Sequence, residues 1–216
     1  MDHSHTHDYQ ICTRCIMDTT AQEIRFDDNG VCSFCTQVET QIRPHWFPND
    51  KGMEKLQAII KKIKHSGQGK DYDSIMGLSG GADSSFMALQ VKKLGLRPLV
   101  VHVDGGWNSQ VAVNNIENII KKLDFDLHTH VVDWEEMRDL QVAFIRSGVA
   151  NVDIPQDHAF FAVLYHFAAQ HKIKYVLSGS NFATESILPS SWGYDAMDSR
   201  HLKSIHKRFG EKKLKT

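Results

Sequence analysis

Ser79-Gly80-Gly81-Ala82-Asp83-Ser84 is the stretch of this chain that decides its fold. It follows a short apolar run, Ser74-Ile75-Met76-Gly77-Leu78, and precedes the helix-like stretch Ser85-Phe86-Met87-Ala88-Leu89-Gln90-Val91. Small residues let the backbone turn tightly and bring its N–H groups close to an anion, and a helix that starts near 83–85 adds further N–H groups and a positive dipole end. The stretch therefore predicts a phosphate cradle between a strand and a helix.

The cradle has no lysine after its glycines, so the pattern G-x-x-x-x-G-K-[ST] is absent and a Walker-type loop is excluded. Ser-Gly-Gly-x-Asp-Ser instead resembles the signature of the PP-loop ATP pyrophosphatases, which split ATP into AMP and pyrophosphate to adenylylate an oxygen of their substrate. The alternative is a glycine-rich turn before an ordinary helix. The expected strand before the motif and the helix after it favour the phosphate cradle.

The rest of the chain alternates strand-like and helix-like patterns. Such alternation predicts an α/β fold, a Rossmann-like parallel sheet with helices on both faces, whose ligands bind at the carboxyl ends of the strands. The remaining expected elements are a helix at 53–64, a strand at 99–103, a helix through 113–123, a strand at 127–132, helices at 134–147 and 156–171, and a strand at 174–177.

The four cysteines of the chain, Cys12, Cys15, Cys32 and Cys35, form the pattern C-x2-C-x16-C-x2-C. Two such pairs can present four thiolates tetrahedrally, which predicts a closed structural zinc site. The alternatives are two disulfides, which the lack of a secretion signal disfavours, and an iron–sulfur cluster. Asp27-Asp28-Asn29-Gly30 between the pairs is a turn sequence that suits the hairpin of a small zinc ribbon.

The N-terminus is polar, and its alternating His3, His5 and His7 are expected to be disordered rather than to form a functional metal site. A stretch containing two prolines then separates the ribbon from the first amphipathic helix. The expected organisation is a disordered segment at 1–10, a zinc ribbon at 11–42, a linker at 43–52 and the ATP pyrophosphatase domain at 53–216.

Composition argues against several classes of function. No apolar run approaches about 18 residues, and the start of the chain lacks the basic end and apolar stretch of a signal peptide, so a cytoplasmic protein with no membrane contact is expected. A formal charge of −1 and a pI near 6.9 provide no global basic field for nucleic acid. The locally basic tail, 203–215, is expected to form a solvated helix face.

Two further strand ends point to the same edge of the sheet as the cradle. His102-Val103-Asp104-Gly105-Gly106-Trp107 ends one strand with an acidic residue and two glycines, which suits the nucleoside part of ATP, although a strand-terminating turn has the same composition. Leu177-Ser178-Gly179-Ser180-Asn181 ends another strand in small polar residues. Because parallel strands end at one edge, the three segments are expected to meet around one nucleotide.

Taken together, these segments resemble the N-acetyl sugar amidotransferases. The resemblance covers about residues 11–215 and implies an ATP-dependent enzyme that converts an acetamido group on a nucleotide-linked sugar acid into an acetamidino group, in the biosynthesis of bacterial surface polysaccharides such as lipopolysaccharide. Family members continue beyond 216, so the resemblance also implies a missing C-terminal segment. The stretches that carry it are 11–20, with the first cysteine pair, 78–85, 101–108 and 178–181.

The resemblance and the strand ends assign expected roles. Asp83 and Ser84 are catalytic candidates, and Asp83 is the candidate ligand of Mg²⁺. His158 and Glu185 are weaker catalytic candidates, whose alternatives are a capping histidine and an ordinary surface carboxylate. Candidate substrate contacts are Trp107, Asp157, Asn181 and Thr184. Expected ATP-binding residues are Leu78, Ser79, Gly80, Gly81, Asp83, Ser84, Ser85, His102, Val103, Asp104, Ser178 and Gly179.

The cysteine count also bears on the source of nitrogen. A cysteine-based glutaminase needs a free thiolate beside a base, and every thiol of the chain is assigned to zinc. With Asp2 after the initiator methionine, an N-terminal nucleophile is not indicated. Ammonia is therefore expected from a separate glutaminase subunit, as the resemblance also implies.

Two other functions stay open at this point. One is a tRNA sulfur-transferase of the same ATPase superfamily, which the exhausted supply of thiols and the near-neutral charge disfavour. The other is a non-catalytic zinc-ribbon adaptor that binds a nucleotide without turning it over. The acceptor that supports pyrophosphate release distinguishes these functions from an amidotransferase.

Overall fold

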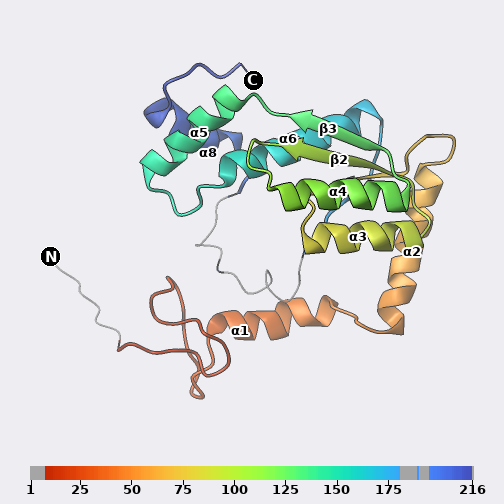
Figure 1. Ribbon diagram of the computed structural model, residues 1–216. Coiled ribbons are helices and arrows are strands. Elements are labelled where there is room, and N and C mark those ends of the chain that lie inside the picture. Colours follow the sequence, from red (N-terminus) through yellow and green to blue (C-terminus); the bar gives the residue numbers. More distant parts are fainter. Residues whose placement is uncertain (1–7, 181–188, 190–194, 216) are drawn as a thin grey trace. The chain divides into compact units, whose positions relative to one another are not determined.

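The computed structural model describes residues 8–180, 189 and 195–215 (Figure 1). The expected disorder at the N-terminus, with His3, His5 and His7, falls largely outside these residues. The chain divides into two compact units. The smaller is Met1–Glu54 with Asn181–Gly193, and the larger is Lys55–Ser180 with Tyr194–Thr216.

The smaller unit is built around the cysteines. Asp27 forms the expected turn, because its Oδ1 accepts hydrogen bonds from the N–H groups of Asn29 and Val31 (both 2.9 Å), and Gly30 adopts a positive φ of 75°. Its buried cluster is small and consists mostly of the cysteines, so apolar burial alone provides little stability. Its helices are α1 (Ser33–Gln37), the π-helix η1 (Val38–Ile42) and the 3₁₀-helix η2 (Arg43–His45).

Helix α2 (Asp50–Ser66) begins earlier than the helix expected from residue 53. Asn49 explains the difference, because its Oδ1 accepts a hydrogen bond from Gly52 N (3.3 Å), as a helix N-cap does. The apolar periodicity used for the prediction starts only at Met53. The start of a helix is therefore better located from its cap than from its first apolar residue.

The larger unit contains a four-stranded parallel sheet with the order β3-β2-β1-β4. The expected strands are confirmed, with the last one shorter than 174–177. The strands are β1 (Ser74–Gly77), β2 (Pro98–Asp104), β3 (Leu127–Val131) and β4 (Val176–Leu177). The helices are α3 (Ala82–Lys93), α4 (Gln110–Leu123), α5 (Trp134–Ser147), α6 (Ile154–Gln170) and α8 (Ser199–Phe209).

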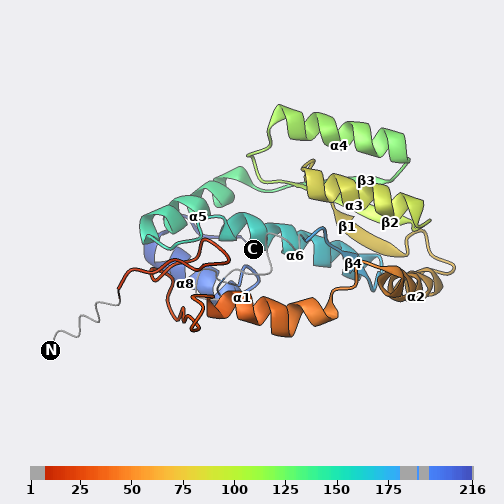
Figure 2. The same cartoon turned by 90° about the horizontal axis from the view of Figure 1, so that it is seen from below.

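Helices cover both faces of the sheet, as the sequence predicts. Side chains alternate along a strand, so Met76 and Val100 face one side while Ile75 and Val101 face the other. Figures 1 and 2 show α3 and α4 on one side of the strands and α6 on the opposite side. The helical residues buried on the first side are Ile60, Ile63, Ala88, Val91 and Ile116, and those on the second are Leu164, Phe167 and Ala168.

The solvated helix face expected at 203–215 is present only in part, with Lys203, Lys207 and Arg208 exposed on helix α8. Helix α8 ends at Phe209, and Leu202 on that helix is buried against α5 and α6. The stretch after Gly210 is not helical, because the N–H groups of Glu211 and Lys212 donate to the carboxylate of Asp139 on α5 (3.1 and 3.0 Å). The tail is therefore attached to the larger unit.

No helix in the described part of the chain has the length and apolar content needed to span a bilayer.

Asp139 is expected to stabilise the attached tail in a pH-dependent way. Burial acts to raise its pKa, but hydrogen bonds from Lys212 N, His206 and Glu211 N outweigh burial, and the pKa lies below its usual value. A lowered folded-state pKa stabilises the fold fully above the unfolded-state pKa, about 3.9, and this contribution disappears as the pH falls through the folded-state value. Asp139→Asn should therefore lower the free energy of unfolding by about 1–2 kcal/mol at pH 7.

Urea denaturation of the wild type and Asp139→Asn at pH 7 and pH 3 measures this effect. The difference between the two proteins should shrink at pH 3, because a protonated carboxyl resembles an amide. A difference that is the same at both pH values would contradict the role assigned to Asp139.

Candidate functional site

The cradle is a closed loop that ends in the first turn of α3. The helix begins at Ala82, and its first internal hydrogen bond runs from Ser85 N to Gly81 O (3.1 Å). The first helical N–H groups therefore precede the hydrogen-bond ladder and point out of the helix end. Ser79 Oγ accepts from Gly81 N (3.4 Å) and lies 3.1 Å from Ser84 Oγ. The loop thus presents backbone donors and hydroxyls where an anion is favoured.

Gly80 is required by the packing of this loop against α4. Its φ is +77°, a left-handed conformation, and a Cβ built there would lie 2.4 Å from the backbone oxygen of Ala112. The side chain of Asn115 donates to Gly80 O (3.0 Å) from the same helix. The close approach of α4 therefore depends on glycine at position 80.

A cavity of about 520 Å³ lies over the carboxyl ends of β1, β2 and β4, within the range of small-molecule sites. The cradle, the start of α4 and one side of α6 complete its wall. The expected site residues that line it are Leu78, Ser79, Asp83, Ser84, His102, Val103, Trp107, Ser178 and Gly179. The three segments that the sequence predicts to meet therefore lie around one cavity.

His102 links two of these segments. It is buried at the end of β2, where its Nδ1 lies 3.0 Å from Leu78 O and its Nε2 lies 3.1 Å from Asn108 Nδ2. The carbonyl accepts and the amide donates, so the ring has its proton on Nδ1. The third segment is equally close, because a Cβ at Gly179 would lie 3.2 Å from Asp83 O. These contacts hold the three strand ends together.

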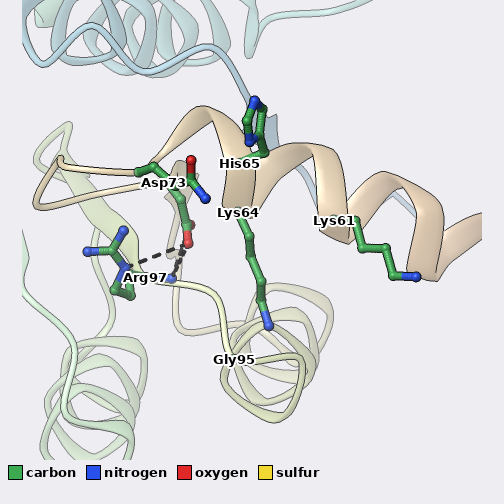
Figure 3. Close-up of a pocket in the computed structure, with 7 residues that line it drawn as sticks. Lys61, Lys64, His65, Asp73, Gly95 and Arg97 are labelled. Atoms are coloured by element: carbon green, nitrogen blue, oxygen red, sulfur yellow. Dashed lines mark hydrogen bonds and ion pairs between the residues drawn. The ribbon is translucent and has the colours of Figure 1, made fainter.

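A second hollow, of about 440 Å³, lies near the opposite, amino-terminal edge of the sheet (Figure 3). Its charged residues have structural contacts. The backbone N–H of Arg97 donates to both carboxylate oxygens of the buried Asp73 (3.0 Å each), and Lys64 extends toward Gly95, just after α3. The Arg97 guanidinium also donates to the backbone oxygens of Gly67, Lys70 and Asp71. The charged residues of this hollow therefore stabilise the turn between α2 and β1.

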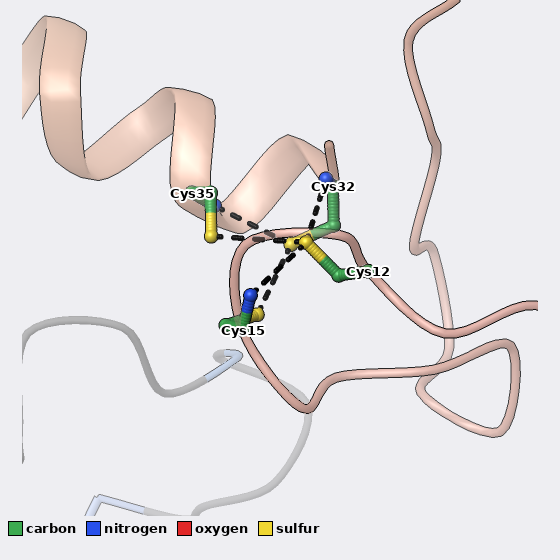
Figure 4. Close-up of side chains that lie close together, drawn as sticks. All are labelled: Cys12, Cys15, Cys32 and Cys35. Atoms are coloured by element: carbon green, nitrogen blue, oxygen red, sulfur yellow. Dashed lines mark hydrogen bonds between the residues drawn. The ribbon is translucent and has the colours of Figure 1, made fainter. Parts of the chain in front are cut away.

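The four cysteines gather in the smaller unit (Figure 4). Cys12 Sγ and Cys35 Sγ are 4.0 Å apart, Cys15 Sγ and Cys32 Sγ are 3.7 Å apart, and all four sulfurs lie within 4.8 Å of one another. Tetrahedral Zn–S bonds of about 2.3 Å place sulfurs about 3.8 Å apart. The cluster fits one tetrahedral ion, and its sulfurs are too far apart for disulfides.

The backbone around the cluster stabilises thiolate. Burial acts to raise the pKa of Cys12, but backbone N–H groups that donate to its sulfur outweigh burial and lower the pKa to about 6. These donors are Arg14 N (3.4 Å), Cys15 N (3.5 Å) and Cys32 N (3.2 Å). Burial raises the pKa of Cys35, and a cation bound at the cluster would favour its thiolate.

Comparison with solved structures identifies the architecture of the chain. A glutamine-dependent NAD⁺ synthetase from Acinetobacter baumannii, in complex with ADP, matches with a TM-score of 0.50 and 17% identity, over 69% of this chain and 30% of that one. An NH₃-dependent NAD synthetase from Campylobacter jejuni matches with a TM-score of 0.47 and 14% identity, over 72% of each chain. The chain therefore shares the α/β fold of the NAD⁺ synthetase from Acinetobacter baumannii, a parallel sheet with helices on both faces.

Comparison with curated sequences gives a more limited result. An uncharacterized protein of Methanocaldococcus jannaschii is 31% identical over 118 residues, which are 54% of this chain. The match spans 40% of that relative's length. No protein-family model matches the chain.

Some expected site residues do not line the cavity at the strand ends. Asp104 accepts a hydrogen bond from Gly106 N (2.9 Å) through its Oδ1, which is the strand-terminating turn considered from the sequence. His158 Nδ1 lies 2.7 Å from Ala196 O, so this ring has a structural contact. Burial, and then the charge of Asp153, raise the pKa of Asp157. The others outside the lining are Gly80, Gly81 and Ser85. Asn181, Thr184 and Glu185 lie outside the described residues.

Several residues that line this cavity are not predicted from the sequence. Phe160 and Leu164 belong to the apolar stripe of α6, but that helix passes the end of the sheet, so both also face the cavity. Ser109 carries a signal that a cap search would find, since its Oγ accepts from Ala112 N (3.2 Å) at the start of α4. The remaining missed residues are Gly77, Met87, Val101, Asn108, Ala112, Gln156, Phe161 and Leu177.

Proposed function

We propose that this chain is an ATP-dependent amidotransferase. It adenylylates the acetamido oxygen of a nucleotide-linked sugar and replaces that oxygen with ammonia, which gives an acetamidino group, in the cytoplasmic biosynthesis of a bacterial surface polysaccharide. The observation that carries this proposal is the phosphate cradle that opens into a cavity at the carboxyl ends of β1, β2 and β4. A protein of the same fold was solved with ADP, which supports a nucleotide in this cavity.

The cradle suits the phosphates of ATP. The N–H groups at the start of α3 and the hydroxyls of Ser79 and Ser84 suit a pyrophosphate, whose negative charge increases as the α–β bond of ATP breaks. The nucleoside extends over the end of β2, beside Val103 and the braced His102. Ser178 and Gly179 close the other side of the cavity.

The reaction balances in two steps. The acetamido oxygen attacks the α-phosphate, the α–β P–O bond breaks, and pyrophosphate leaves with its electron pair. Ammonia then adds to the activated carbon, the carbon–oxygen bond breaks, and AMP carries the former amide oxygen away. The released protons pass to solvent, and an amidine remains. Activation is needed because an amide carbonyl is a poor electrophile.

Asp83 is the residue that fits a magnesium ion. Its carboxylate is on the first turn of α3 and lines the cavity beside the cradle, and carboxylate and phosphate oxygens are the ligands that Mg²⁺ prefers. When bound, the ion supplies charge neutralisation on the phosphate oxygens. Asp83 would hold the ion at the mouth of the cradle.

The nitrogen source is proposed to be a separate glutaminase subunit. All four cysteines of the chain lie in the metal cluster of the smaller unit, so none is free to attack glutamine. The purified chain should therefore release pyrophosphate with ammonium chloride and not with glutamine. A glutaminase-free preparation that uses glutamine as well as ammonium would contradict this assignment.

The acceptor is tested by incubating the chain with ATP, Mg²⁺, ammonium chloride and a panel of nucleotide sugars. AMP and pyrophosphate should form only with an acetamido sugar nucleotide, and mass spectrometry should show the product in which oxygen is replaced by NH. Turnover that requires tRNA would instead identify a tRNA-modifying enzyme. ATP binding without turnover on any acceptor would identify a nucleotide-binding adaptor.

A further inference from the structure

A third hollow, of about 500 Å³, adjoins the nucleotide cavity in the larger unit. Trp107 and Gln156 line both spaces, so the two meet along these side chains. The hollow lies between the loop after β2, helix α5 and the start of α6. We name it the tryptophan cleft, and its lining residues are Trp107, Trp134, Arg138, Gln141, Val142, Ile145, Val152, Asp153 and Gln156.

Two exposed tryptophans form one wall of the tryptophan cleft. Trp107 is 63% exposed and Trp134 is 42% exposed, yet both are held in place. Their rings meet edge to face with centroids 5.6 Å apart, and Trp107 Nε1 donates to Gln141 Oε1 (2.7 Å). A Cβ at Gly106 would lie 2.6 Å from the Trp134 ring, so that ring packs directly on the loop backbone. Ordered, exposed indoles form a platform for the flat face of a ligand.

The polar groups of the cleft are few and varied. Arg138 is exposed on α5 and takes part in none of the ion pairs found among the described residues. The adjacent carboxylate, Asp139, is bonded to His206 and to the N–H groups of Glu211 and Lys212. Glu136 pairs with Lys215 and Glu135 with Lys212, although the charge of Arg138 also contributes to the lowered pKa of Glu135. Asp153 and Gln156, at the start of α6, add acceptor oxygens across the cleft from α5, the helix that carries Arg138. Arg138 is the cation of the cleft and Asp153 its carboxylate, a combination that suits a hydroxyl-rich ligand with one anionic group near Arg138.

We propose that the tryptophan cleft is the acceptor subsite, which binds the sugar ring of an acetamido nucleotide sugar against Trp107 and Trp134, with an anionic group of the ligand facing Arg138. This inference rests on the proposed function. The acetamido group passes the boundary at Trp107 and Gln156 into the nucleotide cavity, where its oxygen reaches the α-phosphate. Asp153 and Gln156 bind sugar hydroxyls. The anionic group is a phosphate of the nucleotide or a carboxylate of the sugar.

Two variants of the full chain test the cleft, Arg138→Gln and Trp134→Leu. Calorimetry with UDP-N-acetylglucosamine and with its uronic acid should show a Kd raised about tenfold or more, for both ligands in Trp134→Leu and for at least the uronic acid in Arg138→Gln. This is the effect of losing an aromatic contact or a charge-assisted hydrogen bond. The KM for ATP should not change. Arg146→Gln is the matched control, because Arg146 lies on the same helix, outside the cleft, and pairs with Glu211. Circular dichroism checks that each variant is folded.

Comparing UDP-N-acetylglucosamine with its uronic acid identifies which anionic group of the ligand faces Arg138. If Arg138 binds a phosphate, Arg138→Gln should weaken UDP-N-acetylglucosamine and its uronic acid equally; if Arg138 binds the sugar carboxylate, only the uronic acid should weaken. Either result supports the cleft. Wild-type affinity for both ligands in a folded Arg138→Gln variant would overturn it.

Failure of the cleft and failure of the proposed function are distinguishable. If sugar turnover occurs but both variants behave as wild type, the function stands and the cleft is wrong. If turnover instead requires tRNA, the proposed function is wrong. The cleft then stands as an acceptor site only if Arg138→Gln raises the KM for tRNA. An unchanged KM for tRNA, or the lack of saturable binding of any acceptor, would overturn the cleft as an acceptor site.

Discussion

Replacing Gly80 with alanine is expected to lower ATP-dependent pyrophosphate release by at least about 100-fold, a loss comparable to that of one oxyanion-hole donor. The new Cβ would meet Ala112 O at 2.4 Å, and the backbone φ of +77° disfavours any side chain. The loop or helix α4 must move, which displaces the N–H groups of the cradle. Steady-state kinetics and ATP binding measure the change.

Gly69→Ala is the matched control for this prediction. Gly69 has a similar φ of +72°, but nothing lies within 4 Å of its built Cβ. Both variants therefore bear the strain of a left-handed alanine, about 1 kcal/mol, and only Gly80→Ala also collides with α4. The control should retain wild-type turnover. Equal loss in both variants, or none in Gly80→Ala, would contradict the structure assigned to the cradle.

Replacing Cys32 with serine is expected to abolish zinc binding and unfold the smaller unit. Cys32 is fully buried, and its sulfur lies 3.7 Å from that of Cys15 within the cluster. Structural zinc contributes about 10 kcal/mol or more to the folding of small domains, far more than the apolar burial available here. Metal analysis should give one zinc ion per wild-type chain and none for the variant.

Thr40→Ala is the control, because Thr40 is exposed on the same unit and its hydroxyl donates to Thr36 O, away from the sulfurs. This variant should keep its zinc and its near-ultraviolet circular dichroism. A strong chelator should reproduce the effect of Cys32→Ser on the wild type. Iron in place of zinc, or a folded smaller unit without metal, would contradict the single-ion site.

The sequence predicts those parts of the molecule that depend on local pattern. Small residues around Gly80 specify the turn, and the alternation of Ile75 and Met76 on β1 follows from burial on two faces. The spacing of the cysteines likewise predicts one compact cluster, because each pair of ligands is close in the chain. Local chemistry thus defined the sheet, the cradle and the cluster.

Features that depend on packing between distant elements were not predicted. The periodicity of α6 shows that Phe160 is on an apolar face, but not that this face extends past the sheet into the cavity. The sequence alone suggests that Arg97 is an ordinary surface cation. In the structure, its guanidinium donates to backbone oxygens that the turn between α2 and β1 brings together. Asp139 attaches the tail across a sequence separation of more than 70 residues, which the composition of the tail does not reveal.

The most direct test of the central claim follows the oxygen atom. An acetamido sugar nucleotide labelled with ¹⁸O in its acetamido group is incubated with the chain, ATP, Mg²⁺ and ammonium chloride, and the nucleotide product is analysed by mass spectrometry. If the amide oxygen attacks the α-phosphate over the cradle, the label should appear in AMP, in step with pyrophosphate release. Formation of ADP and phosphate, or AMP without the label, would contradict the account.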